Sequence, residues 1–226
     1  MTGEQARIRI VATARALDAA GLMPNKSGNV SCRDRDGFLV TPSGVPYGAL
    51  EPGQVVAVAA DGSTMPGAPR PSSEWRLHAA IYAARPEAHA IVHTHSPMAT
   101  ALACAGHALP AFHYMIALAG GDVRLAPYAT FGTDELARRA VAGLAGRRAV
   151  LLANHGVVAI GPTLEAATAV ALEVENMSAQ YLALRAAGLE PQVLDPAELE
   201  RVIAKFADYG RPVPAPELTD AVGVCR

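Results

Sequence analysis

The chain is poor in cysteine and in aromatic residues. Its 226 residues include three cysteines, Cys32, Cys104 and Cys225, which are far apart and form no Cys-x-x-Cys pair. An odd number of scattered cysteines argues against a disulfide framework and against a zinc site built from thiolates. Aromatic residues make up only 5% of the chain, so each tyrosine or phenylalanine outside an apolar run needs its own interpretation.

Long apolar runs and basic patches are absent as well. No apolar stretch reaches the roughly 20 residues that a membrane span requires, and the first residues lack the pattern of a signal peptide. The net charge is −2 and no run of basic residues occurs, so we expect no nucleic-acid partner. These features predict a cytoplasmic protein with a small-molecule ligand, and the length and 51% hydrophobic content predict one domain with a substantial core.

Turn signals and hydrophobic periodicity predict an α/β sandwich, in which helices flank a mixed, largely antiparallel sheet. Helices are predicted at residues 3–20, 72–84, 133–146, 163–187 and 195–210, with another that begins near residue 97. Strands are predicted at residues 30–33, 38–41, 54–60, 90–95, 122–126, 149–154 and 157–160.

Two histidines, His93 and His95, close one of the apolar strands. Successive side chains of a strand point to opposite faces, so these two imidazoles project to the same side and can hold one metal ion. A third histidine, His155, closes another apolar run and is followed by Gly156, where the backbone can turn. Buried imidazoles need partners, and three of them suit a zinc site with a fourth position for water or substrate. The alternative is a set of ordinary core or surface histidines.

An acidic residue, Glu74, follows the helix-opening segment Pro71-Ser72-Ser73. This pattern predicts that Glu74 lies in the first turn of the helix. A carboxylate close to the metal would complete the catalytic chemistry, although an acid at this position is also a common capping residue favoured by the helix dipole. His78 lies one turn further on and is interpreted as a packing or surface residue rather than a ligand.

Small and polar residues gather in three segments that can hold an anion. Two loops, residues 23–29 and 41–44, lie at related ends of one predicted hairpin, and Ser72 and Ser73 lie at a helix N-terminus. Such segments expose backbone N–H groups to which a phosphate can bind. Each segment alone is more often a turn or a cap, but together beside a metal site they predict an anion pocket. Lys26 could add positive charge, although a solvated loop lysine is the simpler interpretation.

Several motifs, in this order and at this spacing, resemble the class II aldolase/adducin family. They are Ser27-Gly28-Asn29-Val30-Ser31, Thr41-Pro42-Ser43-Gly44, Pro71-Ser72-Ser73-Glu74, His93-Thr94-His95 and Asn154-His155-Gly156. The resemblance extends from the first helix to about Gly210, which implies a catalytic domain over residues 1–210 and a proline-rich C-terminal tail over residues 211–226. It also implies a metal-dependent aldehyde-lyase.

The resemblance implies a role for each motif. His93, His95 and His155 would hold Zn²⁺, with Glu74 as the resting fourth ligand that leaves the metal to act as a base. The phosphate of the substrate would be held by the small loops, which correspond here to Gly28, Asn29, Ser43, Gly44, Ser72 and Ser73.

Three aromatic residues complete the implied site. Tyr114 would come from the adjacent subunit of a homotetramer and protonate the aldehyde oxygen, and Phe131 and Tyr209 would line the aldehyde end of the pocket. A tyrosine that is shared across an interface requires an oligomer.

The segments 112–117 and 126–133 are similar to the branch of the family that cleaves L-fuculose 1-phosphate to dihydroxyacetone phosphate and L-lactaldehyde. This phosphorylated sugar is therefore the expected substrate. The alternatives are an aldolase for ribulose or deoxyribulose 1-phosphate and a ribulose-5-phosphate 4-epimerase-like enzyme. A non-catalytic module of the adducin type is disfavoured, because the three histidines and Glu74 are all present.

Overall fold

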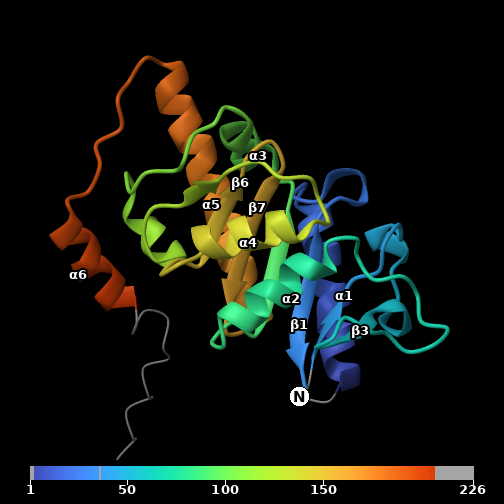
Figure 1. Ribbon diagram of the computed structural model, residues 1–226. Helices are drawn as coiled ribbons and strands as arrows, with labels where there is room; N and C mark the ends of the chain where they lie inside the picture. The colour runs from blue at the N-terminus through green and yellow to red at the C-terminus, as the bar shows by residue number, and fades with distance from the viewer. Residues whose placement is uncertain (1–2, 36, 207–226) are drawn as a thin grey trace, which may run out of the picture.

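A seven-stranded sheet with helices on both faces forms the body of the protein (Figure 1). The structure is a computed structural model, which describes residues 3–35 and 37–206. The strand order is β3-β2-β1-β4-β7-β6-β5. Within the described residues β5 and β6 form the one parallel pair, and the other neighbours are antiparallel. The predicted α/β sandwich with a mixed, mostly antiparallel sheet is therefore confirmed.

The elements follow one another in the order predicted from the sequence. The strands are β1 (Asn29–Asp34), β2 (Gly37–Val40), β3 (Val56–Ala59), β4 (Ala90–Thr94), β5 (Arg124–Ala126), β6 (Ala149–Leu152) and β7 (Gly156–Gly161). The α-helices are α1 (Gly3–Ala19), α2 (Trp75–Ala84), α3 (Pro97–Cys104), α4 (Asp134–Gly143), α5 (Leu164–Ala186) and α6 (Pro196–Phe206). Short 3-10 helices are η1 (Pro24–Lys26), η2 (Tyr47–Ala49), η3 (Pro52–Gln54) and η4 (Tyr114–Ala119).

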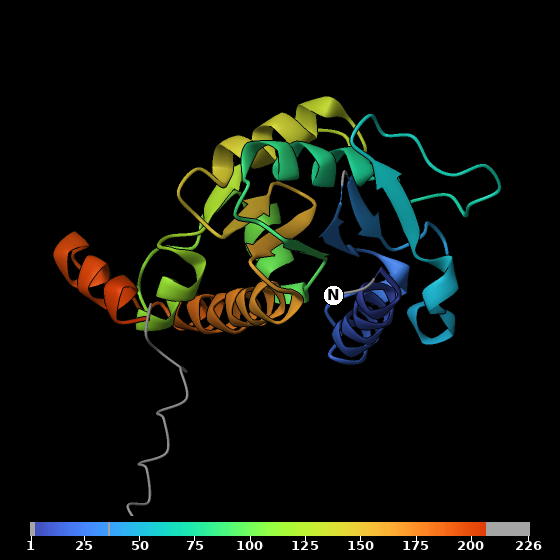
Figure 2. The same ribbon diagram turned by 90° about the horizontal axis from the view of Figure 1, so that it is seen from below.

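The strands β4, β6 and β7 are buried along their whole length, and their side chains alternate between two cores. On one side α1, α3 and α5 pack on the sheet, where Val92 of β4 and Val157 of β7 face them. On the other side α2 and α4 pack on the sheet, where Ile91 and Val158 face them. Figure 2 shows these two helical layers above and below the strands. His93 lies two residues after Ile91 in β4, so its side chain is on the same face of the sheet and points toward α2 and α4.

Some predicted boundaries differ from the structure by a few residues. The strand predicted at 54–60 begins at Val56, because η3 precedes it and the Gln54 side chain accepts a hydrogen bond from the backbone N–H of Glu51. The helix predicted at 72–84 begins at Trp75. The preceding Pro71 forms a β-bridge with Pro42 after β2, and the Ser72 N–H donates to the Thr41 carbonyl at 3.0 Å.

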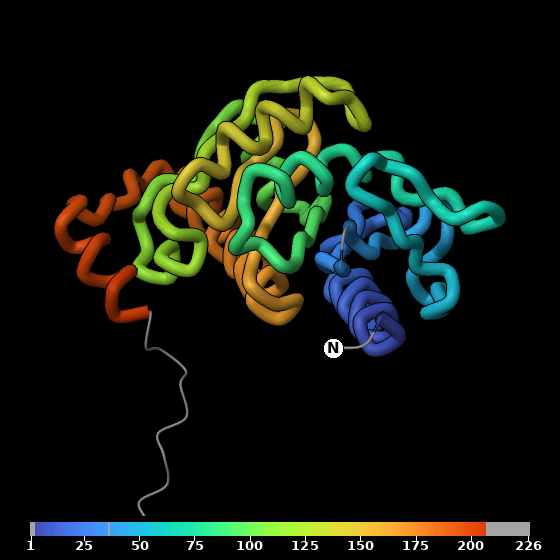
Figure 3. Tube along the Cα trace, turned by 60° about the horizontal axis from the view of Figure 1, so that its bottom comes forward, coloured from blue at the N-terminus to red at the C-terminus, as the bar shows by residue number. Residues whose placement is uncertain are grey.

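The C-terminal helix α6 stands apart from the two layers. It packs on η4, at the opposite end of the molecule from the loop that follows β3 (Figure 3). No helix in the ranges 3–35 and 37–206 combines the length and the apolar character needed to cross a membrane. The predicted tail at 211–226 and the predicted site residue Tyr209 lie outside the described residues.

Candidate metal centre and adjoining cavity

The end of strand β4 supplies two of the four clustered side chains. His93 is fully buried, and its Nδ1 lies 3.0 Å from the Val157 carbonyl oxygen of the neighbouring strand β7. A neutral ring that donates from Nδ1 leaves the Nε2 lone pair free to face the site. His95 follows directly after the strand, and its Nε2 lies 3.1 Å from Nε2 of His93. The two imidazoles therefore meet on one side, as the spacing predicts.

The third histidine lies in the tight turn between β6 and β7. Asn154 adopts a left-handed conformation with φ 55°, which asparagine tolerates better than most residues. A Cβ atom at Gly156 would stand 2.4 Å from the Thr94 carbonyl oxygen, so only glycine lets the turn approach β4 this closely. This turn places the His155 ring 4.9 Å from the rings of both His93 and His95.

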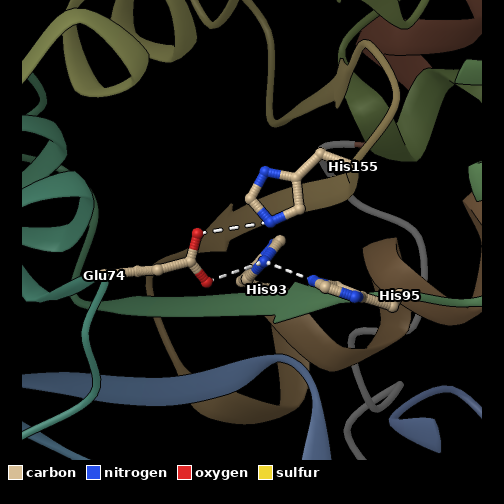
Figure 4. A group of neighbouring side chains, drawn as sticks. All are labelled: Glu74, His93, His95 and His155. Atoms are coloured by element: carbon tan, nitrogen blue, oxygen red, sulfur yellow. Dashed lines mark hydrogen bonds and ion pairs between the residues drawn. The ribbon is translucent and has the colours of Figure 1, made fainter. Parts of the chain in front are cut away.

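Glu74 enters the cluster from the helical side. It occupies the N-cap of α2, with φ −100° and ψ 15°, so its predicted place in the first helical turn was wrong by one position. The bridge between Pro42 and Pro71 precedes the helix, which begins only at Trp75, and the carboxylate of Glu74 points toward the histidines (Figure 4). Its Oε2 lies 3.1 Å from Nε2 of His93, and its Oε1 lies 3.3 Å from Nε2 of His155.

The four side chains converge on one point (Figure 4), and their ligand atoms all lie within 4.8 Å of one another. Among the described residues, the buried Oε1 atom of Glu74 has no hydrogen-bond partner. The Nε2 atoms of His93 and His95 face each other at 3.1 Å, although at most one of them can donate to the other. A divalent cation between these atoms would satisfy all of them, and three imidazoles with one carboxylate match the ligands that zinc accepts. The residues present therefore fit a metal centre.

The protonation states also suit metal binding. Burial opposes the charge on Glu74, but the neighbouring His93 and His155 outweigh it and hold the pKa of Glu74 well below its usual range. Burial and the nearby histidines lower the pKa of His95 to about 3 and that of His155 to about 4. Burial also acts against a charge on His93, yet the Glu74 carboxylate raises the pKa of His93. The site thus combines an ionised carboxylate and neutral imidazoles with a preference for positive charge between Glu74 and His93.

A cavity of about 300 Å³ opens beside the cluster. All six residues that the resemblance implies for phosphate binding line it, together with Glu74, His95, His155 and Phe131. Those six are Gly28, Asn29, Ser43, Gly44, Ser72 and Ser73.

Two backbone hydrogen bonds bring the serine segments together. Ser43 N–H donates to the Arg70 carbonyl at 2.9 Å, and Ser72 N–H donates to the Thr41 carbonyl at 3.0 Å. Gly44 has a left-handed backbone with φ 79°, which turns the chain back at the rim of the cavity. The resulting wall presents small hydroxyl groups and backbone dipoles, which suit a phosphate.

Gly28 allows the first loop to lie against the end of β4. Its φ is 76°, and a Cβ atom there would stand 2.5 Å from the His93 carbonyl oxygen. Gly28→Ala is therefore expected to lower the free energy of unfolding by about 1–3 kcal/mol, measured by denaturant titration. Gly53→Ala is the matched control, because nothing lies within 4 Å of a Cβ atom at that position and its backbone is not left-handed. An equal effect of the two substitutions would contradict this explanation.

The aromatic residues predicted for the site are separated. Phe131 lines the cavity and is 64% exposed, and the next residue, Gly132, lies close against the Ser73 carbonyl oxygen. Tyr114 does not line this cavity. It lies on η4, is 52% exposed and has its ring 6.3 Å from the ring of Phe206. The place of Tyr209 is outside the described residues.

Several contributors were not predicted from the sequence. Tyr128 and Asn154 also line the cavity. The sequence signal for Asn154 was its place between a strand and a glycine, which favours a left-handed turn residue. His78, predicted as a packing or surface residue, is buried and bonded to both Asn29 and Ser31. Lys26 is exposed and lies at the cavity.

The chain is similar to known proteins over most of its length. The model of the family described as class II aldolase and adducin N-terminal domain matches residues 8–182. A 5-methylthioribulose-1-phosphate/5-deoxyribulose-1-phosphate aldolase of Rhodospirillum rubrum is 47% identical over 214 residues, which are 93% of this chain and 96% of that protein. An L-fuculose phosphate aldolase of Escherichia coli is 42% identical over 203 residues, covering 89% and 94%. A solved structure of an L-fuculose 1-phosphate aldolase superposes with a TM-score of 0.87 at 40% identity, covering 90% and 96%.

Proposed function

The chain belongs to the class II aldolase and adducin family and is a metal-dependent aldehyde-lyase, and from this premise we propose that it cleaves a 5-modified ribulose 1-phosphate. The substrate would be 5-deoxyribulose 1-phosphate or its 5-methylthio analogue. The products would be dihydroxyacetone phosphate and a two-carbon aldehyde, which carries a hydrogen or a methylthio group at its second carbon.

The observation that supports this substrate is the similarity to the Rhodospirillum rubrum relative, which is 47% identical over 214 aligned residues. The L-fuculose phosphate aldolase of Escherichia coli is 42% identical over 203 aligned residues. The exposed Phe131 ring at the cavity is also compatible with an apolar methyl or methylthio end. The substrate predicted from the motifs, L-fuculose 1-phosphate, is therefore the second candidate. It is supported by the superposition with a TM-score of 0.87.

Three histidines and one carboxylate would hold the metal: His93, His95, His155 and Glu74. A divalent cation such as Zn²⁺ at this position would act as a Lewis acid on the ketone carbonyl and neutralise charge that develops on its oxygen. The two serine segments and the loop at Gly28 would orient the substrate by holding its phosphate. Both ends of the Asn29 amide contact protein groups, but its Nδ2 atom has a second hydrogen that a phosphate oxygen could accept.

The chain's own groups would move two protons. As the C3–C4 bond of the ketose breaks, the C4 hydroxyl group would give its proton to the deprotonated Tyr114 oxygen of a neighbouring subunit. The electron pair of that bond would remain on C3, where Glu74, after taking up a proton from solvent, would deliver it to complete dihydroxyacetone phosphate. In the condensation direction Glu74 would take this proton from the carbon next to the ketone, and Tyr114 would protonate the aldehyde oxygen.

The test compares four substrates on the zinc-loaded protein: 5-deoxyribulose, 5-methylthioribulose, L-fuculose and ribulose 1-phosphates. Release of dihydroxyacetone phosphate is followed by its coupled reduction with NADH. The expected result is the highest kcat/KM with one of the two 5-modified pentuloses. A tenfold or greater preference for L-fuculose 1-phosphate would overturn the substrate and keep the aldolase. No cleavage of any of the four would overturn the proposed reaction.

Tyr114 is not among the residues that line the described cavity and is 52% exposed, which is compatible with a role in the site of a second subunit. We therefore propose the homotetramer that the resemblance implies. A cytoplasmic location stays a prediction.

Tyr114→Phe is expected to lower kcat by about 10²- to 10⁴-fold, as for the loss of a proton-transfer group. Mixing it with Glu74→Gln subunits, followed by dissociation and reassembly, is expected to restore activity. In such hybrids about a quarter of the sites would combine an intact Glu74 with an intact Tyr114 from the neighbour. The measurement is kcat of the mixture against each variant alone. If Tyr114 acted within its own subunit, no site would be intact and mixing would restore nothing.

A further inference from the structure

A row of buried polar side chains connects Glu74 to the interior of the protein. Asn29 and Ser31 are alternate residues of β1, so they share the face that looks toward α2. His78 and Tyr82 lie four residues apart on α2 and look back at this face. All five side chains are buried, and His78 and Ser31 have no exposed surface. Polar groups in such a place need complete hydrogen bonding.

The contacts between these side chains form one continuous hydrogen-bond chain. Asn29 Nδ2 donates to Glu74 Oε2 at 3.0 Å, and Asn29 Oδ1 contacts Nε2 of His78. On the other side of the ring, His78 Nδ1 lies 2.6 Å from Ser31 Oγ. Ser31 Oγ in turn lies 2.8 Å from the Tyr82 hydroxyl oxygen.

The chemistry of these groups allows only one direction of hydrogen-bond donation along this hydrogen-bond chain. The Glu74 carboxylate accepts only, so Asn29 must turn its amide nitrogen toward Glu74 and its carbonyl oxygen toward His78. That oxygen also accepts only, and therefore His78 must carry its proton on Nε2. The unprotonated Nδ1 then accepts from the Ser31 hydroxyl.

The direction of the last hydrogen bond, between Ser31 and Tyr82, follows from the number of available protons. The hydroxyl group of Ser31 has one hydrogen, which goes to His78, so its oxygen accepts from the Tyr82 hydroxyl. Burial, together with the nearby His93, lowers the pKa of His78 to about 3. The ring is thus neutral at physiological pH, and a single tautomer satisfies every bond.

We propose that His78 is a positioning residue, which fixes the amide of Asn29 and through it the Oε2 atom of Glu74 in the orientation that meets the metal. Without the Nε2 donor, the buried Asn29 carbonyl oxygen loses this partner, and the amide is no longer held from both sides. Asn29 can then shift to find another donor, and the Oε2 atom of Glu74 loses its fixed orientation toward the metal. The consequence for metal binding requires no substrate, and only the consequence for turnover rests on the proposed function.

The first experiment identifies the tautomer. Protein labelled with ¹⁵N at histidine is examined by NMR without metal and with zinc, and the His78 signals are assigned by their loss in His78→Gln. The expected result is a protonated Nε2 and an unprotonated Nδ1 in both samples. A ring protonated on Nδ1, alone or with Nε2, would overturn the direction of the chain.

The second experiment measures the zinc dissociation constant by competition with a chelator. His78→Leu fills a similar volume without a donor and is expected to weaken zinc binding about 10- to 100-fold, as for other residues that orient metal ligands. His78→Gln can place an amide N–H near the Nε2 position and is expected to stay within about threefold of the wild type. His107→Leu is the matched control, because His107 is exposed and is not a member of the cluster.

Two outcomes would overturn the positioning role. One is an unchanged zinc dissociation constant in His78→Leu, and the other is an equal loss in His78→Gln and His78→Leu. Neither measurement uses a sugar phosphate. A protein that passes both tests but cleaves no ketose 1-phosphate would therefore disprove the proposed function alone.

Discussion

Glu74→Gln is expected to lower kcat for cleavage of a ketose 1-phosphate by about 10²- to 10⁴-fold, the usual effect of losing a general base or acid. Glutamine keeps the length of the side chain and an oxygen that can accept from Asn29, whose Nδ2 lies 3.0 Å from Oε2 in the wild type. It cannot carry the proton that moves between Glu74 and the carbon next to the ketone. The substitution therefore separates proton transfer from packing.

Proton exchange isolates this step from the rest of the reaction. Wild-type protein in D₂O is expected to replace a proton on the unphosphorylated carbon of dihydroxyacetone phosphate, which NMR detects, and Glu74→Gln is expected to lose this exchange. Saturating zinc keeps metal occupancy equal, because Glu74 is also a proposed ligand. Glu165→Gln serves as the control, since this exposed carboxylate pairs with Arg9 and is not a member of the cluster. Exchange by Glu74→Gln within tenfold of the wild-type rate would contradict the proposed role.

The convergence of the three histidines was predictable because it depends on local rules. The alternation of side chains puts His93 and His95 on one face. The run that precedes His155 forms β6, and antiparallel pairing of both β4 and β6 with β7 brings their carboxyl ends to the same edge. Apolar residues in a two-sided core thus fixed the register, and the histidines followed from it.

The sequence predicted that Glu74 would lie close to the histidines, but it did not predict its position at the N-cap of α2. The sequence indicated a helix from Ser72, whereas the bridge between Pro42 and Pro71 holds this segment in an extended form and makes Glu74 the N-cap of α2. Such a bridge joins segments that are far apart in the chain, so no local pattern contains it. The same limit applies to His78, whose role depends on the register that places Asn29 opposite His93.

The substrate was less predictable than the metal site, for a physical reason. The proposed metal ligands His93 and His155 lie at the ends of buried strands, whereas Phe131, predicted for the aldehyde end, is exposed, and Tyr209, predicted for the same end, lies outside the described residues. Motifs near these positions favoured the six-carbon sugar, while the relative with 47% identity favours a five-carbon sugar. Surface positions tolerate substitution without loss of the fold, so the residues at these positions give weaker sequence evidence for the substrate.

Removal of the metal is expected to abolish cleavage and to lower thermal stability. Without a cation, the buried Glu74 Oε1 has no hydrogen-bond partner among the described residues, and two imidazole nitrogens face each other at 3.1 Å. Binding only to the folded state stabilises it by about 2.7 kcal/mol at a hundredfold excess over the dissociation constant. For a chain of this length, this corresponds to an increase in Tm of roughly 5–11 °C. The measurements are kcat and Tm after chelation and after zinc is restored.

The matched variants distinguish loss of the metal from general damage. His155→Ala removes a proposed ligand, so the Tm of this variant is expected to change little on zinc addition and its activity to stay near that of the chelated protein. His89→Ala is the control, because His89 is exposed and outside the cluster, and it is expected to respond to zinc as the wild type does. A chelated wild-type protein that kept both its turnover and its Tm would contradict the metal centre. Restored Tm without restored turnover would support the centre and contradict its part in cleavage, because the Lewis acid would then be present without effect.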